Sequence, residues 1–434
     1  MDRRDFLWLL PGIGATTWLQ GCATDPVTGK QSFVMMDKSQ EVALDKKHSP
    51  HQFSEDYGIS QDTQVNQYIA GVGKQMATGT HRPDMPYVFQ AVNANYVNAY
   101  AFPGGSIACT RGILLELESE DQLAALLGHE LGHVNARHFA ESQAKGTLVD
   151  LAVAGVSIAA ASKNAEYGQI AQMIGGLGGG ALLAHYSRDN EREADALGVE
   201  YMTRAGYNPD GMTDLMTMLN TQSKSKPNAL ELMFSTHPMS SERLENTRKS
   251  LQKPAYADAA KRVKQRERYM DRTNRLRAIK PAIAEEQKAE AMLAKKGFDK
   301  AEGHLKTALS IVPNDYAGLV LMAKTQMAME RPKEAEPYLE RAKAIYPTEA
   351  QAQHLTGVTK LQLRQPEAAL AAFKAYESLL PGNADTMFLQ GYSMEQMQDK
   401  KGAAQAYYRY LQLADQGKQA SYAYNRLKAW GAVR

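Results

Sequence analysis

The residues best suited to chemistry are two histidines and a glutamate in the sequence H-E-L-G-H, at 129–133. They lie within Asp121–His138, where apolar residues recur at helical spacing. If this stretch is a helix, His129 and His133 project from one face, close enough for both imidazoles to hold one Zn²⁺. Glu130 then lies beside the pair, where its carboxylate can take a proton from a water that the metal has made acidic. The pattern predicts a hydrolase.

A catalytic zinc usually has three protein ligands, so one more must come from elsewhere in the chain. A second helical segment, at 187–198, reads S-R-D-N-E-R-E-A-D-A-L-G and places Glu191 and Asp195 on one face. We expect Glu191 to be the third ligand, with one zinc per chain. Asp195 would orient a ligand histidine through its free ring N–H. Glu193, elsewhere on the same helix, is the alternative third ligand.

The chain resembles the HtpX and CAAX-prenyl-protease family of zinc gluzincin peptidases in H-E-L-G-H-V-N-A-R-H, at 129–138, and E-R-E-A-D-A-L-G, at 191–198. It is most similar to the soluble, periplasmic BepA-like branch, which carries a C-terminal tetratricopeptide domain. The resemblance extends to N-A-Y-A-F-P-G-G-S-I-A-C-T-R-G-I-L-L, at 98–115, and to S-T-H-P-M-S-S-E-R, at 235–243. It implies a zincin-like peptidase domain over 23–248.

Two strands are expected before the zinc helix, one after Met85 and one over Ser106–Thr110. A peptidase needs a strand edge, because an extended peptide can add to it by backbone hydrogen bonds. From the resemblance, we expect Ser106, Ile107 and Ala108 to form this substrate edge. The alternative is an ordinary buried strand.

His237 belongs to a T-H-P segment that matches the family pattern. Two catalytic roles are open to it. It could stabilise the oxyanion of the tetrahedral intermediate, or it could fill the open position on zinc and keep the enzyme inactive. The third possibility is a structural histidine.

Residues 1–22 are expected to be a lipoprotein signal peptide. Arg3 and Arg4 precede a short apolar run, and L-Q-G-C at 19–22 resembles a lipoprotein cleavage box, which would make Cys22 the lipidated N-terminus. Export could be general or by the twin-arginine route, and the alternative to cleavage is an anchor helix. Cys109 would then be the single remaining cysteine. We expect a periplasmic protein anchored to the outer membrane.

The chain of 434 residues has a formal net charge of +2, which gives no electrostatic case for nucleic acid. Basic residues do concentrate at 243–280, with thirteen Lys and Arg against four Asp and Glu. We expect a basic connecting helix over 249–280, either simply solvated or in contact with anionic lipid or an acidic partner. The Gly/Ala-rich segments 147–161 and 170–184 are too short to span a bilayer, so they would pack around the active site or cover it.

The C-terminal part, 281–434, repeats with a period of 34. Equivalent positions hold Ala301, Ala335, Ala369 and Ala403, and then Pro313, Pro347 and Pro381. This period is typical of tetratricopeptide repeats, in which helix pairs stack into a solenoid. We expect four repeats, a capping helix over 419–430 and a concave surface that binds protein.

These observations predict a fold that is mainly α, with a small β-sheet in the N-terminal zincin-like domain and a C-terminal α-solenoid. The expected function is a zinc endopeptidase that degrades misfolded or stalled envelope proteins. The repeats would recruit this substrate, or the outer-membrane assembly machinery. The alternative is a periplasmic chaperone or scaffold with a latched or vestigial peptidase.

Overall fold

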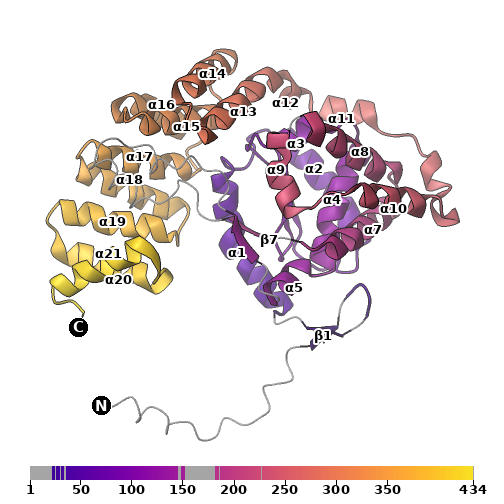
Figure 1. Ribbon diagram of the computed structural model, residues 1–434, viewed down its shortest axis with the longest axis horizontal. Coiled ribbons are helices and arrows are strands. Elements are labelled where there is room, and N and C mark those ends of the chain that lie inside the picture. Colours follow the sequence, from indigo (N-terminus) through magenta and orange to yellow (C-terminus); the bar gives the residue numbers. More distant parts are fainter. Residues whose placement is uncertain are drawn as a thin grey trace, which may run out of the picture.

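A three-stranded sheet lies inside the N-terminal domain of the computed structural model (Figure 1). Its strands are β3 (Val88–Val92), β5 (Ser106–Thr110) and β4 (Ala99–Ala101), in that order across the sheet. β3 runs parallel to β5, and β4 runs antiparallel to it. The structure describes residues 22–24, 26–29, 31–33, 36–144, 148–151, 181–184, 186–225 and 227–433.

The sheet order shows that the predicted substrate edge is wrong. Ser106, Ile107 and Ala108 belong to β5, which is the central strand, so its backbone is paired on both sides. The error comes from β4, which is only three residues long and shows no clear alternation in the sequence. The strand nearest the histidines is β4, because its Ala101 and His133 line one small hollow.

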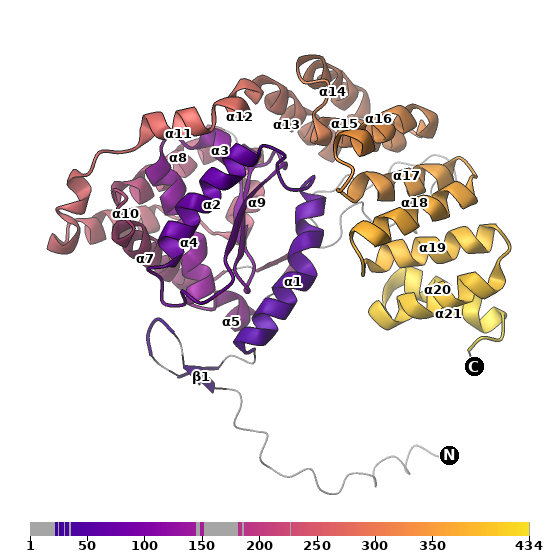
Figure 2. The same cartoon turned by 180° about the vertical axis from the view of Figure 1, so that it is seen from behind.

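Helices surround this sheet. They are α1 (Lys38–Glu55), α2 (Thr63–Ala77), α3 (Arg111–Glu116), α4 (Glu120–Asn135), α5 (His138–Ala144), α7 (Arg188–Arg204), α8 (Asp210–Ser225), α9 (Pro227–Thr236) and α10 (Ser241–Leu251). Two further strand pairs are short and antiparallel. β1 (Cys22–Thr24) pairs with β2 (Gln31–Phe33), and β6 (Leu148–Leu151) pairs with β7 (Ala181–Ala184). In Figure 2, α2 lies in front of α4 on one side of the sheet.

Two glycines allow α4 and α7 to meet backbone to backbone. A Cβ on Gly128 would lie 2.9 Å from the carbonyl oxygen of Gly198, and one on Gly132 would lie 2.9 Å from Cα of Ala194. Every residue of α4 is buried, and the Ser119 hydroxyl caps its start by accepting from the Gln122 N–H. This close packing holds the H-E-L-G-H face of α4 directly against the acidic residues of α7.

The basic segment after α10 is not one helix, so the predicted connecting helix over 249–280 is wrong. α10 ends at Leu251, and two 3-10 turns, Pro254–Tyr256 and Ala259–Lys261, precede α11 (Arg266–Arg272) and α12 (Asn274–Ala278). Pro254 cannot continue a helix from α10, because it lacks a backbone N–H. None of the described helices is both long and apolar enough to cross a bilayer.

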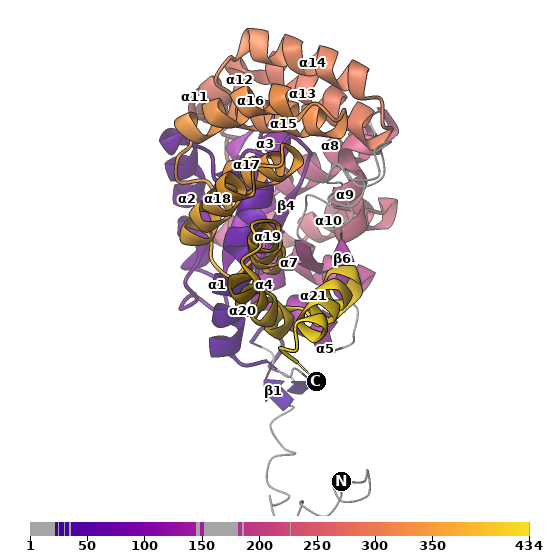
Figure 3. The same ribbon diagram turned by 90° about the vertical axis from the view of Figure 1, so that its left-hand side faces the viewer.

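Four helix pairs and a capping helix form the C-terminal domain (Figure 3). They are α13 (Lys280–Ala294) with α14 (Phe298–Ile311), α15 (Tyr316–Ala328) with α16 (Pro332–Ile345), α17 (Gln351–Gln362) with α18 (Pro366–Leu379), α19 (Ala384–Gln396) with α20 (Lys400–Leu413), and α21 (Gly417–Ala429). A Cβ on Gly357 would lie 2.4 Å from the Phe373 ring, and one on Gly391 would lie 2.7 Å from the Tyr407 ring, so these two positions have room for glycine alone. The predicted fold class is confirmed.

The turn between α1 and α2 is embedded in the repeats. Tyr57, with a left-handed φ of 63°, is part of the hydrophobic core of the C-terminal domain. Its ring lies under the Lys324 ammonium, at 4.9 Å. Such a backbone conformation costs about 1 kcal/mol in a non-glycine residue, so burial of the ring must compensate. A Cβ on Gly58 would collide with Glu349, at 2.6 Å.

An ion-pair cluster continues this junction. Arg111, at the start of α3, donates to Asp315 at 2.7 Å and pairs with Glu286, and all three side chains are buried. All residues of α15 are buried as well. The α1–α2 turn and the start of α3 in the N-terminal domain therefore cover part of the first repeats.

Two sequence-based predictions fall outside the described residues. These are the signal peptide over 1–22, of which only Cys22 is described, and most of the Gly/Ala-rich hairpin, of which only β6 and β7 are described.

Candidate metal centre

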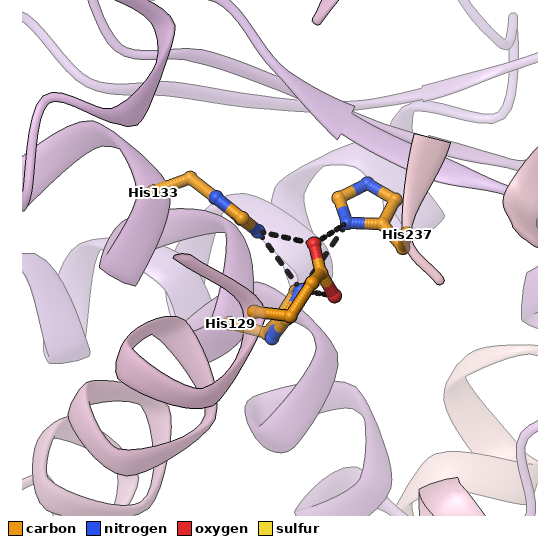
Figure 4. Close-up of side chains that lie close together, drawn as sticks. His129, His133 and His237 are labelled. Carbon is orange, nitrogen blue, oxygen red and sulfur yellow. Dashed lines mark hydrogen bonds and ion pairs between the residues drawn. The ribbon is translucent and has the colours of Figure 1, made fainter. Parts of the chain in front are cut away.

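Four buried side chains from three segments converge on one point. Nε2 of His129 and Nε2 of His133, one turn apart on α4, are 3.0 Å apart. Glu191 of α7 lies 3.3 Å from His133 Nε2 and 3.5 Å from His129 Nε2. His237, just after α9, places Nδ1 3.3 Å from His129 Nε2. Figure 4 shows the three imidazoles pointing toward one another, and one atom of each of the four residues lies within 4.8 Å of the others.

Charges and burial favour the metal-binding forms of Glu191 and His133, whereas they favour the protonated form of His129. Burial raises the pKa of a carboxyl, but the charges of His237 and His129 outweigh it and hold the pKa of Glu191 well below its usual range. Burial lowers the pKa of His133 well below its ordinary value. Burial also acts to lower the pKa of His129, but Glu191 and Asp195 together raise it to about 10. Metal binding would therefore displace a proton from His129.

Glu130 adds a carboxylate that its surroundings do not satisfy. It is buried, and its Oε2 has no hydrogen-bond partner among the described residues. Its Oε1 lies 3.8 Å from His237 Nε2, and burial raises the pKa of its carboxyl. Imidazole and carboxylate ligands with a free carboxylate beside them suit zinc, which accepts nitrogen and oxygen donors and needs a base next to it for hydrolysis. The donor set therefore fits a zinc ion.

Comparison with known proteins agrees with this geometry. Residues 63–251 match the model of peptidase family M48, and residues 292–357 match a tetratricopeptide repeat model. Residues 63–251 therefore resemble peptidase family M48, and we call them the M48 domain. The predictions of a metallopeptidase domain of this family, and of repeats after it, are confirmed.

Relatives of this M48 domain carry protease names. A beta-barrel assembly-enhancing protease of Yersinia pestis is 29% identical over 192 residues, which are 43% of this chain and 39% of that protein. Metalloprotease LoiP of Escherichia coli is 31% identical over 173 residues, 40% of this chain and 66% of LoiP. Mitochondrial metalloendopeptidase OMA1 of Schizosaccharomyces pombe is 28% identical over 248 residues, 56% of this chain and 71% of OMA1. The match spans about two fifths of the beta-barrel assembly-enhancing proteases.

Behind the cluster, the M48 domain holds His129 through a carboxylate. Asp195 Oδ1 lies 3.0 Å from His129 Nδ1, as the sequence-based expectation for Asp195 requires. Arg243 donates to Asp195 from Nε at 2.8 Å and from Nη2 at 2.7 Å, and its Nη1 is 2.6 Å from Glu191 Oε2. Arg243 thus fixes both acidic residues of α7. Sequence reasoning gave it no role, although it lies within the T-H-P segment quoted above.

His133 is held by a different pair. α4 ends at Asn135 instead of continuing to His138, and Arg137, with a φ of 59°, turns the chain back. His138 then places Nδ1 2.9 Å from His133 Nδ1, and its Nε2 lies 3.3 Å from Glu193. Glu193, the alternative third ligand, therefore lies outside the four-residue cluster and contacts His138.

An aromatic ring completes the M48 site. Tyr186 stacks on His133 with ring centroids 3.9 Å apart and an angle of 19° between the planes. It is buried and also lies against His237, at 5.6 Å. Neither Tyr186 nor His138 could be assigned from spacing alone, because their contacts depend on how α5 and the start of α7 pack against α4.

Proposed function

We propose that the chain is a zinc-dependent endopeptidase that binds one Zn²⁺ through His129, His133 and Glu191. The observation that carries this proposal is the convergence of these three donors beside the unsatisfied carboxylate oxygen of Glu130. When bound, zinc supplies a Lewis acid that polarises a carbonyl and lowers the pKa of a water.

The chain's own residues would do the rest. Glu130 takes a proton from the attacking water as general base and returns it to the leaving amine. Asp195 and Arg243 keep the His129 ring in one orientation, and His138 does the same for His133. An extended peptide would bind along β4, which is an edge strand whose Ala101 lies beside His133.

We propose that the substrates are misfolded or stalled proteins of the cell envelope. Support comes from relatives named beta-barrel assembly-enhancing protease and from the L-Q-G-C sequence, which would place the mature chain in the periplasm, anchored by a lipid on Cys22. The test is degradation of an unfolded outer-membrane β-barrel protein by the wild type and by Glu130→Gln. Loss in the variant supports the proposal, and equal degradation overturns it.

The repeats would recruit the substrate or an outer-membrane assembly partner. Because the N-terminal domain covers α15, the surface proposed for this role is the last repeat and the capping helix. Tyr408, Leu413 and Tyr424 are 56%, 51% and 44% exposed there, and exposed large apolar side chains are common at protein interfaces.

His237 supports a second candidate function, a chaperone or scaffold whose peptidase is latched. Its Nδ1 lies among the three donors, so it is placed to act as a fourth protein ligand. A fourth ligand would exclude the attacking water. We propose that His237 acts as this latch. The alternative role is oxyanion stabilisation, and the two roles predict opposite changes in the rate of proteolysis by His237→Ala.

A further inference from the structure

Two hollows follow one another along the seam between α2 and the α11–α12 segment. The larger, of about 430 Å³, is lined by Gln67, Tyr68 and Gly71 from α2 and by Arg268 and Arg272 from α11. The smaller, of about 290 Å³, continues past the start of α2, and its walls include Val65 of α2 and Arg275 of α12. α2 and the α11–α12 segment contribute to both hollows, and the smaller one is also lined by the α1–α2 turn, by β3 and α3, and by Asp315 and Tyr316 at the start of α15. We call the two hollows together the α2 groove.

Acidic side chains in the α2 groove are already engaged. Glu120 accepts from the Tyr68 hydroxyl at 2.8 Å with one oxygen and from Arg268 at 2.6 Å with the other. Asp62 caps α2 by accepting from the Gln64 and Val65 N–H groups at 3.0 and 3.3 Å. The acidic groups are therefore satisfied within the protein.

Two basic side chains in the groove are not engaged. Within the part of the chain that the structure describes, neither Arg272 nor Arg275 forms an ion pair, and both are exposed. Other basic residues of the segment do have structural partners. Lys264 pairs with Asp214 at 2.5 Å, and Arg277 donates to the carbonyls that end α3. The groove thus keeps two available guanidinium groups, one at the end of α11 and one in α12.

Gly71 lies on the floor of the groove without a structural reason to be glycine. It is exposed in the middle of α2, and a Cβ there would meet nothing within 4 Å. Gly73 differs, because a Cβ would collide with the Phe89 ring at 2.4 Å. A glycine inside a helix costs about 1 kcal/mol relative to alanine. An open floor at Gly71 is what a closely approaching backbone would need.

We propose that the α2 groove binds an acidic, extended segment of a partner protein. The unpaired guanidinium groups match carboxylates, the concave floor matches a chain, and the exposed Gln67 amide can bond its backbone. A flat membrane fits less well. In Figures 1, 2 and 3, α11 and α12 lie at the opposite end of the molecule from β1, which contains the proposed lipid attachment at Cys22.

The test uses the full chain and a fluorescent peptide of alternating Glu and Ser, followed by anisotropy. The double variant Arg272→Glu/Arg275→Glu should weaken binding at least ~10-fold, because it reverses both available charges. Arg266→Glu is the matched control. Arg266 is exposed on α11, like Arg272, but does not line either hollow. The affinity of Arg266→Glu for the peptide should therefore stay within about twofold of the wild type, a change well below 1 kcal/mol.

Gly71→Leu tests the shape of the groove separately from its charge. The side chain would occupy the groove without disturbing the core, so the melting temperature should be unchanged or higher while peptide binding is lost. The proposal is overturned if the peptide binds no better than its Gln/Ser counterpart, or if Arg266→Glu weakens binding as much as the double variant. It is also overturned if phosphatidylglycerol vesicles, and not the peptide, bind in a manner that depends on Arg272 and Arg275.

Discussion

Nδ1 of His237 lies 3.0 Å from Oε1 of Glu191, so the T-H-P segment reaches the carboxylate proposed as a zinc ligand. The segment that follows α9 and the acidic helix α7 therefore share one site. Anything that moves His237 changes what the cluster of donors can hold, and the first three predictions follow from this arrangement.

Metal content should depend on Glu191 and not on Glu193. His133→Ala and Glu191→Ala should each lose zinc, because each removes one of three protein donors. Glu193→Ala should keep close to one zinc per chain, since Glu193 contacts only His138 in this region. Elemental analysis after dialysis measures the content. Zinc retained by Glu191→Ala but lost by Glu193→Ala would reverse the assignment.

Glu130→Gln should retain zinc and lose catalysis. The amide preserves the shape of the side chain but cannot act as a base, so hydrolysis of an unfolded substrate should fall by ~100-fold or more. Zinc content measured on the same preparation is the control. A variant that keeps both zinc and most of its activity would show that another group is the base.

His237→Ala should raise the basal rate of proteolysis, including self-cleavage, because it removes the fourth donor from the cluster. If His237 stabilises the oxyanion instead, turnover should fall by roughly 10- to 1000-fold. The assay compares zinc-loaded wild type and variant on one unfolded substrate. An unchanged rate would make His237 a structural residue.

Arg243→Lys should weaken zinc binding while leaving the fold intact. Lysine keeps the charge but cannot make the forked contact to Asp195, so His129 loses its fixed orientation. A 10- to 100-fold loss of affinity is expected for such a supporting contact, measured by competition with a chelator. Arg248→Lys, exposed on the same helix, is the control and should bind zinc like the wild type.

Stability at the domain junction should depend on pH through Lys324. Burial lowers the pKa of this lysine to about 8 from 10.5, against the opposing charges of Glu55 and Glu290. Between those values the unfolded chain binds more protons, so stability rises with pH and is lost as the pH falls through about 8. From pH 7 to pH 10 the wild type should gain about 2–3 kcal/mol of unfolding free energy relative to Lys324→Met. Denaturant unfolding of both proteins at pH 7 and pH 10 measures this difference. If the free energy of unfolding changed by the same amount in both proteins, the prediction would be contradicted.

The parts predicted well from sequence are those set by local periodicity. His129 and His133 share a helix face because of their spacing, and the 34-residue period gives the helix pairs. β4 was missed because three residues carry too little pattern. Arg243 and His138 were missed because their partners lie on other elements, and no spacing rule links Arg243 to Asp195.

The junction at Tyr57 was missed for the same reason. In the sequence, this left-handed turn indicates only a break between two helices. The folded chain shows that the Tyr57 ring enters the core of the repeats.

Because Tyr57 and Gly58 are embedded among the repeats, the two domains cannot be exchanged independently of each other. A solenoid grafted from a relative would have to bring a matching recess for this turn, and a peptidase domain moved alone would carry an exposed tyrosine and an unpaired Arg111. Recombination can exchange them cleanly only if the turn and the first repeats move together. The peptidase domain and the repeat domain therefore depend on each other through this junction.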